Sequence, residues 1–75
     1  MAVTNLVQLN PGQKIRIAPQ YMGTGAPADS DTLATDTVAN PKGTTYYDIT
    51  NHKQYFREAV STPGVAADFK SVTYS

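Results

Sequence analysis

The stretch TTYYDITNHKQYFREAV, residues 44–60, carries the strongest secondary-structure pattern of this chain. It contains two runs rich in aromatic and β-branched residues, 44–50 and 54–60, on either side of the polar triplet Asn51-His52-Lys53. Residues of these types favour strands, and a short polar segment between two such runs is typical of a β-hairpin. We therefore expect a hairpin over residues 44–60.

The second half of this stretch also fits a short helix at about 51–60. Its apolar face would carry His52, Tyr55, Phe56, Ala59 and Val60, which fall at helical spacing. A helix of about ten residues has little stability without tertiary support, so the strand interpretation is preferred. The alternative fold class is α+β with this one helix.

Two extended segments are expected near the N-terminus. Residues 3–9 mix apolar and polar side chains and end at the turn Asn10-Pro11-Gly12, which indicates an extended arm within residues 1–10. Residues 13–18 alternate, with Ile15 and Ile17 on one side, which predicts a strand with one buried face.

The other segments are less regular. Residues 19–31 are rich in Gly, Ala, Pro and Asp and are interpreted as a long loop, and residues 32–39 are weakly β-like. Residues 67–74 are expected to form a last strand, with Phe69, Val72 and Tyr74 as candidates for burial or contact. The predicted fold is therefore all-β: one small domain over residues 1–75, built from short antiparallel strands, with an N-terminal arm and a long loop.

The apolar inventory of the chain is small. Six Val, three Leu, three Ile and two Phe make 14 of 75 residues, and a chain of this length buries only about 60% of its unfolded surface. The formal net charge is zero, and ten Thr with five Tyr favour strands, so we expect a folded chain with a thin core.

Small domains with thin cores usually need disulfides, a metal or a neighbouring chain. The sequence has no Cys and one His, which rules out disulfides and the usual His and Cys metal cage. Association with protein, through copies of itself or a larger scaffold, is therefore the expected source of added stability.

The charge pattern argues against nucleic acid and membranes as partners. Six basic and six acidic residues balance, whereas binders of phosphate surfaces usually carry a basic excess. The first basic residue is Lys14, and no long apolar run precedes it, so we expect neither a signal peptide nor a membrane span.

His52, Asp48 and either Ser61 or Ser71 supply the residue types of a nucleophilic triad. No Gly-x-Ser-x-Gly motif accompanies them, and so short a chain has little volume for a pocket that excludes water. His52 is therefore interpreted as a turn residue. We predict no catalytic residue, no enzyme activity and no small-molecule substrate.

Two other polar clusters resemble ligand sites in part. Asp29, Ser30, Asp31 and Asp36 have part of the spacing of a calcium loop but lack its Gly and closing Glu. The segment Gly23-Thr24-Gly25 lacks the third Gly and the following helix of a phosphate loop. We predict no metal ligand and no cofactor.

The hairpin carries aromatic and basic residues together, of the kind that stack on single-stranded nucleic acid. Asp48 and Glu58 lie in the same hairpin and offset its positive charge, so nucleic acid is not expected. Tyr, Phe and Arg are enriched in protein interfaces. The predicted interface residues are Val3, Leu6, Val7, Leu9, Tyr46, Tyr47, Tyr55, Phe56, Arg57, Phe69 and Tyr74.

By its general character the chain resembles the small virion proteins of tailed bacteriophages. The shared features are small size, no Cys, balanced charge, abundant Thr, Ala, Val and Tyr, and strands punctuated by Pro and Gly. Capsid decoration and cement proteins are the most similar type. The resemblance implies a homo-oligomer that binds the major capsid protein on the virion after synthesis in the host cytoplasm. The alternative is a free-standing binding module for carbohydrate, nucleic acid or a regulatory protein.

Overall fold

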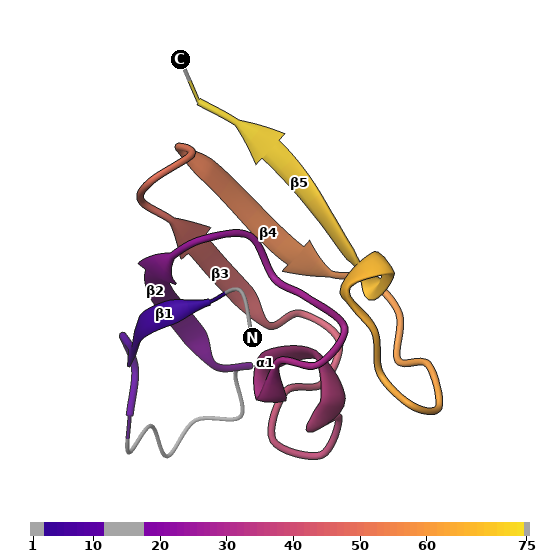
Figure 1. The fold of residues 1–75 in the computed structure, drawn as a ribbon. Coiled ribbons are helices and arrows are strands. Elements are labelled where there is room, and N and C mark those ends of the chain that lie inside the picture. Colours follow the sequence, from indigo (N-terminus) through magenta and orange to yellow (C-terminus); the bar gives the residue numbers. More distant parts are fainter. Residues whose placement is uncertain (1–2, 12–17, 75) are drawn as a thin grey trace.

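The computed structural model describes residues 3–11 and 18–74. Within these residues, five strands form one mixed sheet in the order β1-β2-β3-β4-β5, which confirms the prediction of a mainly β fold (Figure 1). The strands are β1 (Thr4–Gln8), β2 (Gln20–Thr24), β3 (Thr45–Asp48), β4 (Lys53–Arg57) and β5 (Phe69–Thr73). A short helix, α1 (Thr32–Thr35), and a 3₁₀ turn, η1 (Ala66–Asp68), complete the described elements.

The predicted hairpin is present as β3 and β4. The two strands pair antiparallel from Thr45 opposite Phe56 to Asp48 opposite Lys53, which leaves a four-residue loop over 49–52. His52 in this loop has φ 55°, a left-handed conformation in which His is enriched relative to most residues. The alternative helix at 51–60 is therefore wrong, because cross-strand pairing of the aromatic residues prevails over their helical spacing.

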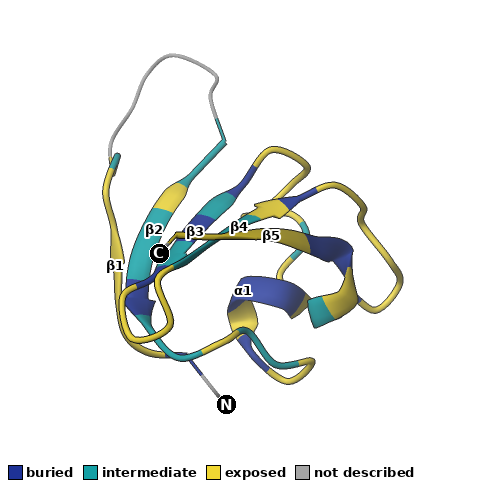
Figure 2. Cartoon of the chain, turned by 90° about the horizontal axis from the view of Figure 1, so that it is seen from above, coloured by how far each residue is buried: buried dark blue, intermediate teal, exposed yellow. Residues whose placement is uncertain are grey.

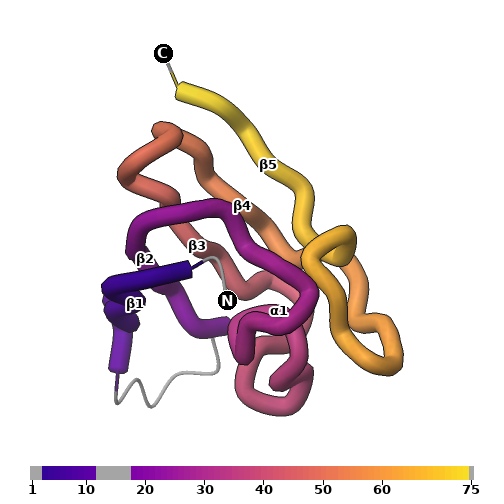
Figure 3. Tube along the Cα trace, viewed as in Figure 1, coloured from indigo at the N-terminus to yellow at the C-terminus, as the bar shows by residue number. Residues whose placement is uncertain are grey.

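The two terminal segments form the edges of the sheet. β1 falls within the predicted N-terminal arm, and β5 falls within the predicted last strand. Figure 3 shows them at opposite ends of the strand order. Most of the strand predicted over 13–18, including Ile15 and Ile17, lies outside the described residues.

The prediction of a long loop over residues 19–31 is wrong, because this segment contains β2. This strand pairs antiparallel with β1 but parallel with β3, so the sheet is mixed and not wholly antiparallel. Gly23 lies within β2, and a Cβ at this position would lie 2.9 Å from the Thr4 carbonyl oxygen and 3.2 Å from the Tyr46 ring. The glycine that makes the segment look like a loop is thus required by the close packing of the strand.

A parallel pair needs a crossover, and residues 25–44 supply it. They contain α1, so the weak strand expected over 32–39 is also wrong. The helix begins after Asp31, whose carbonyl oxygen accepts the amides of Ala34 and Thr35. Viewed as in Figure 2, α1 lies against one face of the sheet.

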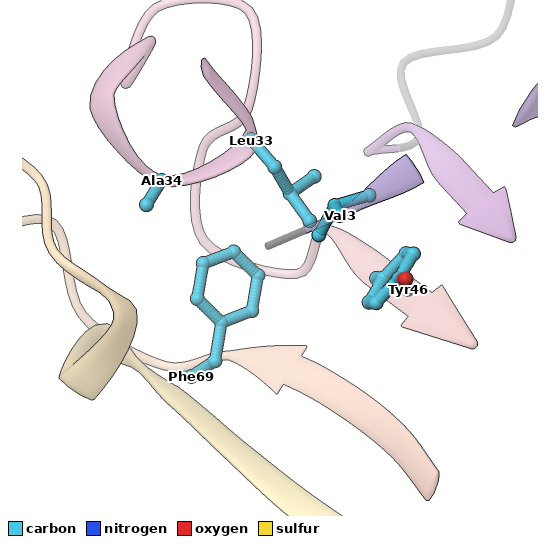
Figure 4. Close-up of a cluster of buried hydrophobic side chains, with 5 residues drawn as sticks. All are labelled: Val3, Leu33, Ala34, Tyr46 and Phe69. Atoms are coloured by element: carbon cyan, nitrogen blue, oxygen red, sulfur yellow. The ribbon is translucent and has the colours of Figure 1, made fainter. Parts of the chain in front are cut away.

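The hydrophobic core lies between α1 and the sheet. Figure 4 shows its buried side chains pointing toward one another from α1, β3, β5 and the residue before β1. They are Val3, Leu33, Ala34, Tyr46 and Phe69. Tyr21 and Tyr55 pack at its margin. The core is small, in agreement with the apolar inventory.

Candidate interaction surface

The two faces of the sheet differ in burial. All buried strand residues lie on the face toward α1, here called the covered face; they are Gly23, Tyr46, Asp48, Arg57 and Phe69. The opposite face is here called the outer face and consists of Thr4, Val7, Gln20, Met22, Thr24, Thr45, Tyr47, Gln54, Phe56, Lys70 and Val72. None of these eleven residues is buried. The outer face is therefore the side of the sheet that the described part of the chain leaves open.

The outer face carries one continuous cross-strand row. Strand register places its members side by side on all five strands: Val7, Met22, Tyr47, Gln54 and Val72. Val7 is 49% exposed, Val72 is 50% exposed, and Phe56 beside the row is 39% exposed. Directly opposite side chains on neighbouring strands lie within contact distance, so these residues form a single surface and not isolated apolar spots.

Tyr74 extends this surface beyond β5. Its ring lies 6.1 Å from that of Tyr47, centroid to centroid, at an interplanar angle of 56°. Its hydroxyl lies 3.4 Å from the Gln54 side-chain oxygen, and its backbone amide donates to the His52 carbonyl at 2.7 Å. The last aromatic residue is thus held against the hairpin while 48% of it stays exposed.

The structure divides the predicted interface residues into two groups. Leu6, Val7, Leu9, Phe56 and Tyr74 are exposed, and Tyr47 is half-buried on the outer face; their contact with a partner stays a prediction. Val3, Tyr46, Arg57 and Phe69 are buried inside the chain, and Tyr55 packs against the core. For the second group, contact with a partner also stays a prediction, and within this chain these side chains hold the fold together.

Arg57 is the clearest case of a predicted contact residue with an internal role. Its side chain is fully buried, and each of its five N–H groups has an acceptor at 2.8–3.2 Å. The acceptors are the carbonyl oxygens of Leu33, Ala34, Asn40 and Ala59 and the carboxylate of Asp68. The guanidinium also lies 5.1 Å from the centroid of the Phe69 ring. Arg57 therefore fastens the crossover to the end of β4.

Asp68 completes this buried polar cluster. Its carboxylate accepts hydrogen bonds from the Ser61 hydroxyl, the backbone amides of Ser61 and Val65, and Arg57. The Ser61 hydroxyl bond has the largest effect and, with the other donors, holds the pKa of Asp68 well below its ordinary value despite burial. The cluster fixes the loop between β4 and β5 against α1.

Asp48 has a similar structural role at the other end of the hairpin. Its carboxylate accepts the amides of Gly25, Thr50 and Asn51 and the side-chain amide of Asn51. Burial raises the pKa of Asp48, but these hydrogen bonds outweigh it and leave the pKa lowered. The carboxylate is thus committed to the hairpin loop and to the turn after β2.

This geometry does not assemble the triad considered for His52. His52 precedes β4 and Ser61 follows it, so the length of a five-residue strand, about 16 Å, separates them. Ser71 lies opposite Tyr55 in the middle of β5, and Asp48 is engaged by its own loop. The arrangement provides no base placed against a nucleophile.

The other polar clusters are also engaged internally. The Asp31 carboxylate accepts the amides of Ala28 and Val3, and the Asp36 carboxylate accepts that of Ala39. Among the residues that the structure describes, no group of three or more His, Cys, Asp or Glu side chains could hold a metal ion. In the Gly23-Thr24-Gly25 segment, the Gly25 amide donates to Asp48.

Three members of the outer-face row, Met22, Gln54 and Val72, are absent from the predicted interface residues, although Val72 was expected to be a candidate for burial or contact. Met22 falls in the segment interpreted as a loop, and Gln54 is a polar residue beside the more prominent Tyr55 and Phe56. The signal for Gln54 is its period-2 relation to Phe56, which places both on one face of β4.

Comparison with known proteins adds no identification. No family model matches the chain, and neither a curated protein nor a solved structure matches it. No helix in residues 3–11 and 18–74 is long and apolar enough to cross a membrane.

Proposed function

We propose that this chain is a non-enzymatic structural protein whose outer face packs against protein subunits of a larger assembly. The observation that carries the proposal is the row of Val7, Met22, Tyr47, Gln54 and Val72, which runs unburied across all five strands. A sheet normally buries its apolar face against another layer, and a partner subunit would supply the layer that the outer face lacks.

The composition of the outer face fits a protein partner. Aromatic residues and Met are enriched at the centres of protein interfaces, where charged residues are depleted. Lys70 is the one charged residue among the eleven of the outer face. Full burial of an apolar anchor contributes about 1.5–3 kcal/mol, and about half of that is available from Val7 or Val72 because each is already half-buried.

The small core gives a second, independent support. Among the residues that the structure describes, five buried hydrophobic residues form it, and two of them are an Ala and a Val. A partner that binds only the folded chain stabilises it by mass action. Packing against a scaffold would therefore hold together a domain that has little apolar material of its own.

Within this class, we propose a virion decoration or cement role, with the major capsid protein as the partner. A capsid repeats one surface many times, so weak contacts of a small subunit add up through avidity. Exposed Leu6 and Leu9 beside Val7 would extend the contact along the β1 edge. The chain would then reside on the virion.

The test is incorporation into particles. Particles purified from the virus or cells that produce the chain are analysed by mass spectrometry for its presence and copy number. We expect a stoichiometric, high-copy component, and we expect a Val7→Lys/Phe56→Lys variant to be lost from the particles. Val38→Lys is the matched control, because Val38 is 92% exposed but lies outside the sheet. Absence of the chain from every large particle would refute the virion role.

A free-standing binding module is the second candidate, favoured by the outer-face pair of half-buried Tyr47 and exposed Tyr74, which could stack on a sugar ring. Thermal unfolding of the purified chain separates the two. A module stable alone has a high midpoint that does not depend on protein concentration. An assembly subunit has a low midpoint that rises when its partner is added.

A further inference from the structure

We infer that two copies of this chain pair antiparallel through their β5 edges, with Val72 opposite Val72 of the second copy. The inference deepens the proposed function, on which it rests for the role of the outer face, by naming a second copy as one partner. It concerns the edge of the sheet, which is a different surface from the outer face.

The two edges of the sheet are not equally suited to pairing. β1 is irregular: its register against β2 shifts between Thr4 and Val7, and Asn5 has φ 55°. Bulges of this kind protect an edge from further strands. β5 pairs with β4 over five consecutive residues without a shift, and four of its five residues are exposed. The regular edge is therefore β5 (Figure 1).

The hydrogen-bond pattern between β4 and β5 shows which backbone groups of β5 are free to pair with another strand. The Tyr74 amide donates toward the hairpin, to the His52 carbonyl. The direction of the backbone hydrogen bonds alternates along an antiparallel strand. The N–H and C=O groups of Val72 and Lys70 therefore also point toward β4, whereas those of Ser71 and Thr73 point away from it. No backbone hydrogen bond of Ser71 or Thr73 to another described residue points outward from this edge. These are the groups that a second strand would use.

Side-chain chemistry selects the register. Centring the pair on Lys70 would place two ammonium groups directly opposite each other, and centring it on Ser71 would leave them diagonal neighbours. Centring it on Val72 separates them by four residues along the strand and places each Lys70 opposite Tyr74 of the other copy. It also places Val72 on Val72 and Ser71 on Thr73, and these pairs suit a sheet.

In this register Ser71 and Thr73 form hydrogen-bonded pairs across the interface, with about four backbone bonds in all. The two-fold axis runs through the Val72 pair, perpendicular to the sheet. Both outer faces therefore point to the same side, and the row through Tyr47 and Gln54 continues from one copy into the next. The dimer would present twice the outer face to one target surface, which is the geometry that avidity requires.

Single-cysteine crosslinking tests the register, because the natural chain has no Cys. Residues opposite each other in a non-hydrogen-bonded pair have Cα atoms about 4.5 Å apart, within the range of a disulfide. We expect Val72→Cys to give a disulfide-linked dimer on mild oxidation. Tyr74→Cys, on the same face and with Lys70 kept, is the matched control and stays monomeric, because the two copies of residue 74 lie about 13 Å apart in this register. Crosslinking of Tyr74→Cys as efficient as that of Val72→Cys would overturn the register.

Hydrogen exchange supplies a readout that needs no substitution. In a concentrated sample, we expect the Ser71 and Thr73 amides to become protected relative to a dilute one, while the Lys70 and Val72 amides are protected in both. Thr73→Pro removes an outward N–H and should abolish dimerisation in sedimentation analysis, whereas Thr73→Ala should retain it.

A wild-type chain that sediments as a monomer up to millimolar concentration, with Ser71 and Thr73 unprotected, would overturn the dimer. This result is distinguishable from failure of the proposed function, which is judged by presence in particles. A monomer found in particles refutes the dimer alone. A dimer found in no particle refutes the virion role alone.

Discussion

Arg57 Nη2 lies 2.8 Å from Asp68 Oδ2, and both side chains are buried. This ion pair joins the end of β4 to the residue before β5, and Arg57 at the same time binds three carbonyl groups of the crossover. The buried side-chain N and O atoms that the structure describes all have hydrogen-bond partners. A buried polar cluster around Arg57 and Asp68, whose side-chain N and O atoms are hydrogen-bonded, thus adds to the small apolar core.

Replacing Arg57 should therefore damage the fold severely. We expect Arg57→Met to lower the free energy of unfolding by about 3–5 kcal/mol, because Asp68 is left as an unpaired buried charge and the carbonyls lose their donors. Urea unfolding measures the loss. Arg57→Lys, which keeps the charge but cannot reach all five acceptors, should cost less, and Lys70→Met on the exposed strand should cost under about 0.5 kcal/mol. Equal stability of Arg57→Met and the wild type would contradict this role.

The lowered pKa of Asp68 predicts how stability depends on pH. The ordinary pKa of this carboxyl is 3.8 and its pKa in the folded chain is lower, so its stabilising effect is present at neutral pH. It is lost as the pH falls below about 4 toward the folded pKa. We expect unfolding free energies measured between pH 7 and pH 3 to fall less for Asp68→Asn than for the wild type. Parallel curves for the two proteins would exclude this contribution.

Gly64 lies against the same cluster and should not tolerate a side chain. A Cβ there would lie 2.0 Å from the Ala34 carbonyl oxygen and 2.6 Å from Arg57 Nη2, so the backbone must move. We expect Gly64→Ala to cost about 1–3 kcal/mol or more in thermal or urea unfolding. Its control is Gly23→Ala, where the shortest contact is 2.9 Å and the loss should be smaller. The reverse order would show that the Arg57 cluster can shift freely.

His52 should behave as a turn residue. Its φ of 55° favours Gly and Asn and penalises β-branched side chains. We expect His52→Asn to keep the thermal midpoint and His52→Val to lower stability by about 1–2 kcal/mol. Neither variant should alter incorporation into particles. A His52→Asn chain that is fully stable but fails to function would point to a chemical role for the imidazole.

The sequence predicted the elements that depend on local pattern. The hairpin followed from Tyr46, Tyr47, Tyr55 and Phe56, an extended N-terminal segment followed from the mixed apolar and polar residues 3–9, and a last strand was expected over residues 67–74. β2 was not predicted, because its parallel partner β3 is 25 residues away and Gly23 gives β2 the composition of a loop. Neither was α1, a single turn within the crossover.

The burial of Arg57 could not be predicted from the local sequence pattern. An arginine next to Phe56 has the pattern of an interface, and only the convergence of carbonyls at Leu33, Ala34 and Asn40 makes its burial favourable. The sequence identified only some of the residues on the outer side of the sheet. Tyr47, Phe56 and Tyr74 were identified from their types, whereas Met22 entered the face through the parallel pairing of β2.

Hydroxyl-radical footprinting of the chain, free and assembled in its particle, measures whether the outer face is the contact surface. We predict that Tyr47, Phe56 and Tyr74 react in the free chain and become protected on assembly, while buried Tyr46 reacts in neither state. Val38, 92% exposed and outside the sheet, should keep its reactivity and serves as the internal control. Protection of Val38 with unchanged reactivity at Tyr47, Phe56 and Tyr74 would contradict the account, because the chain would then bind through the other side.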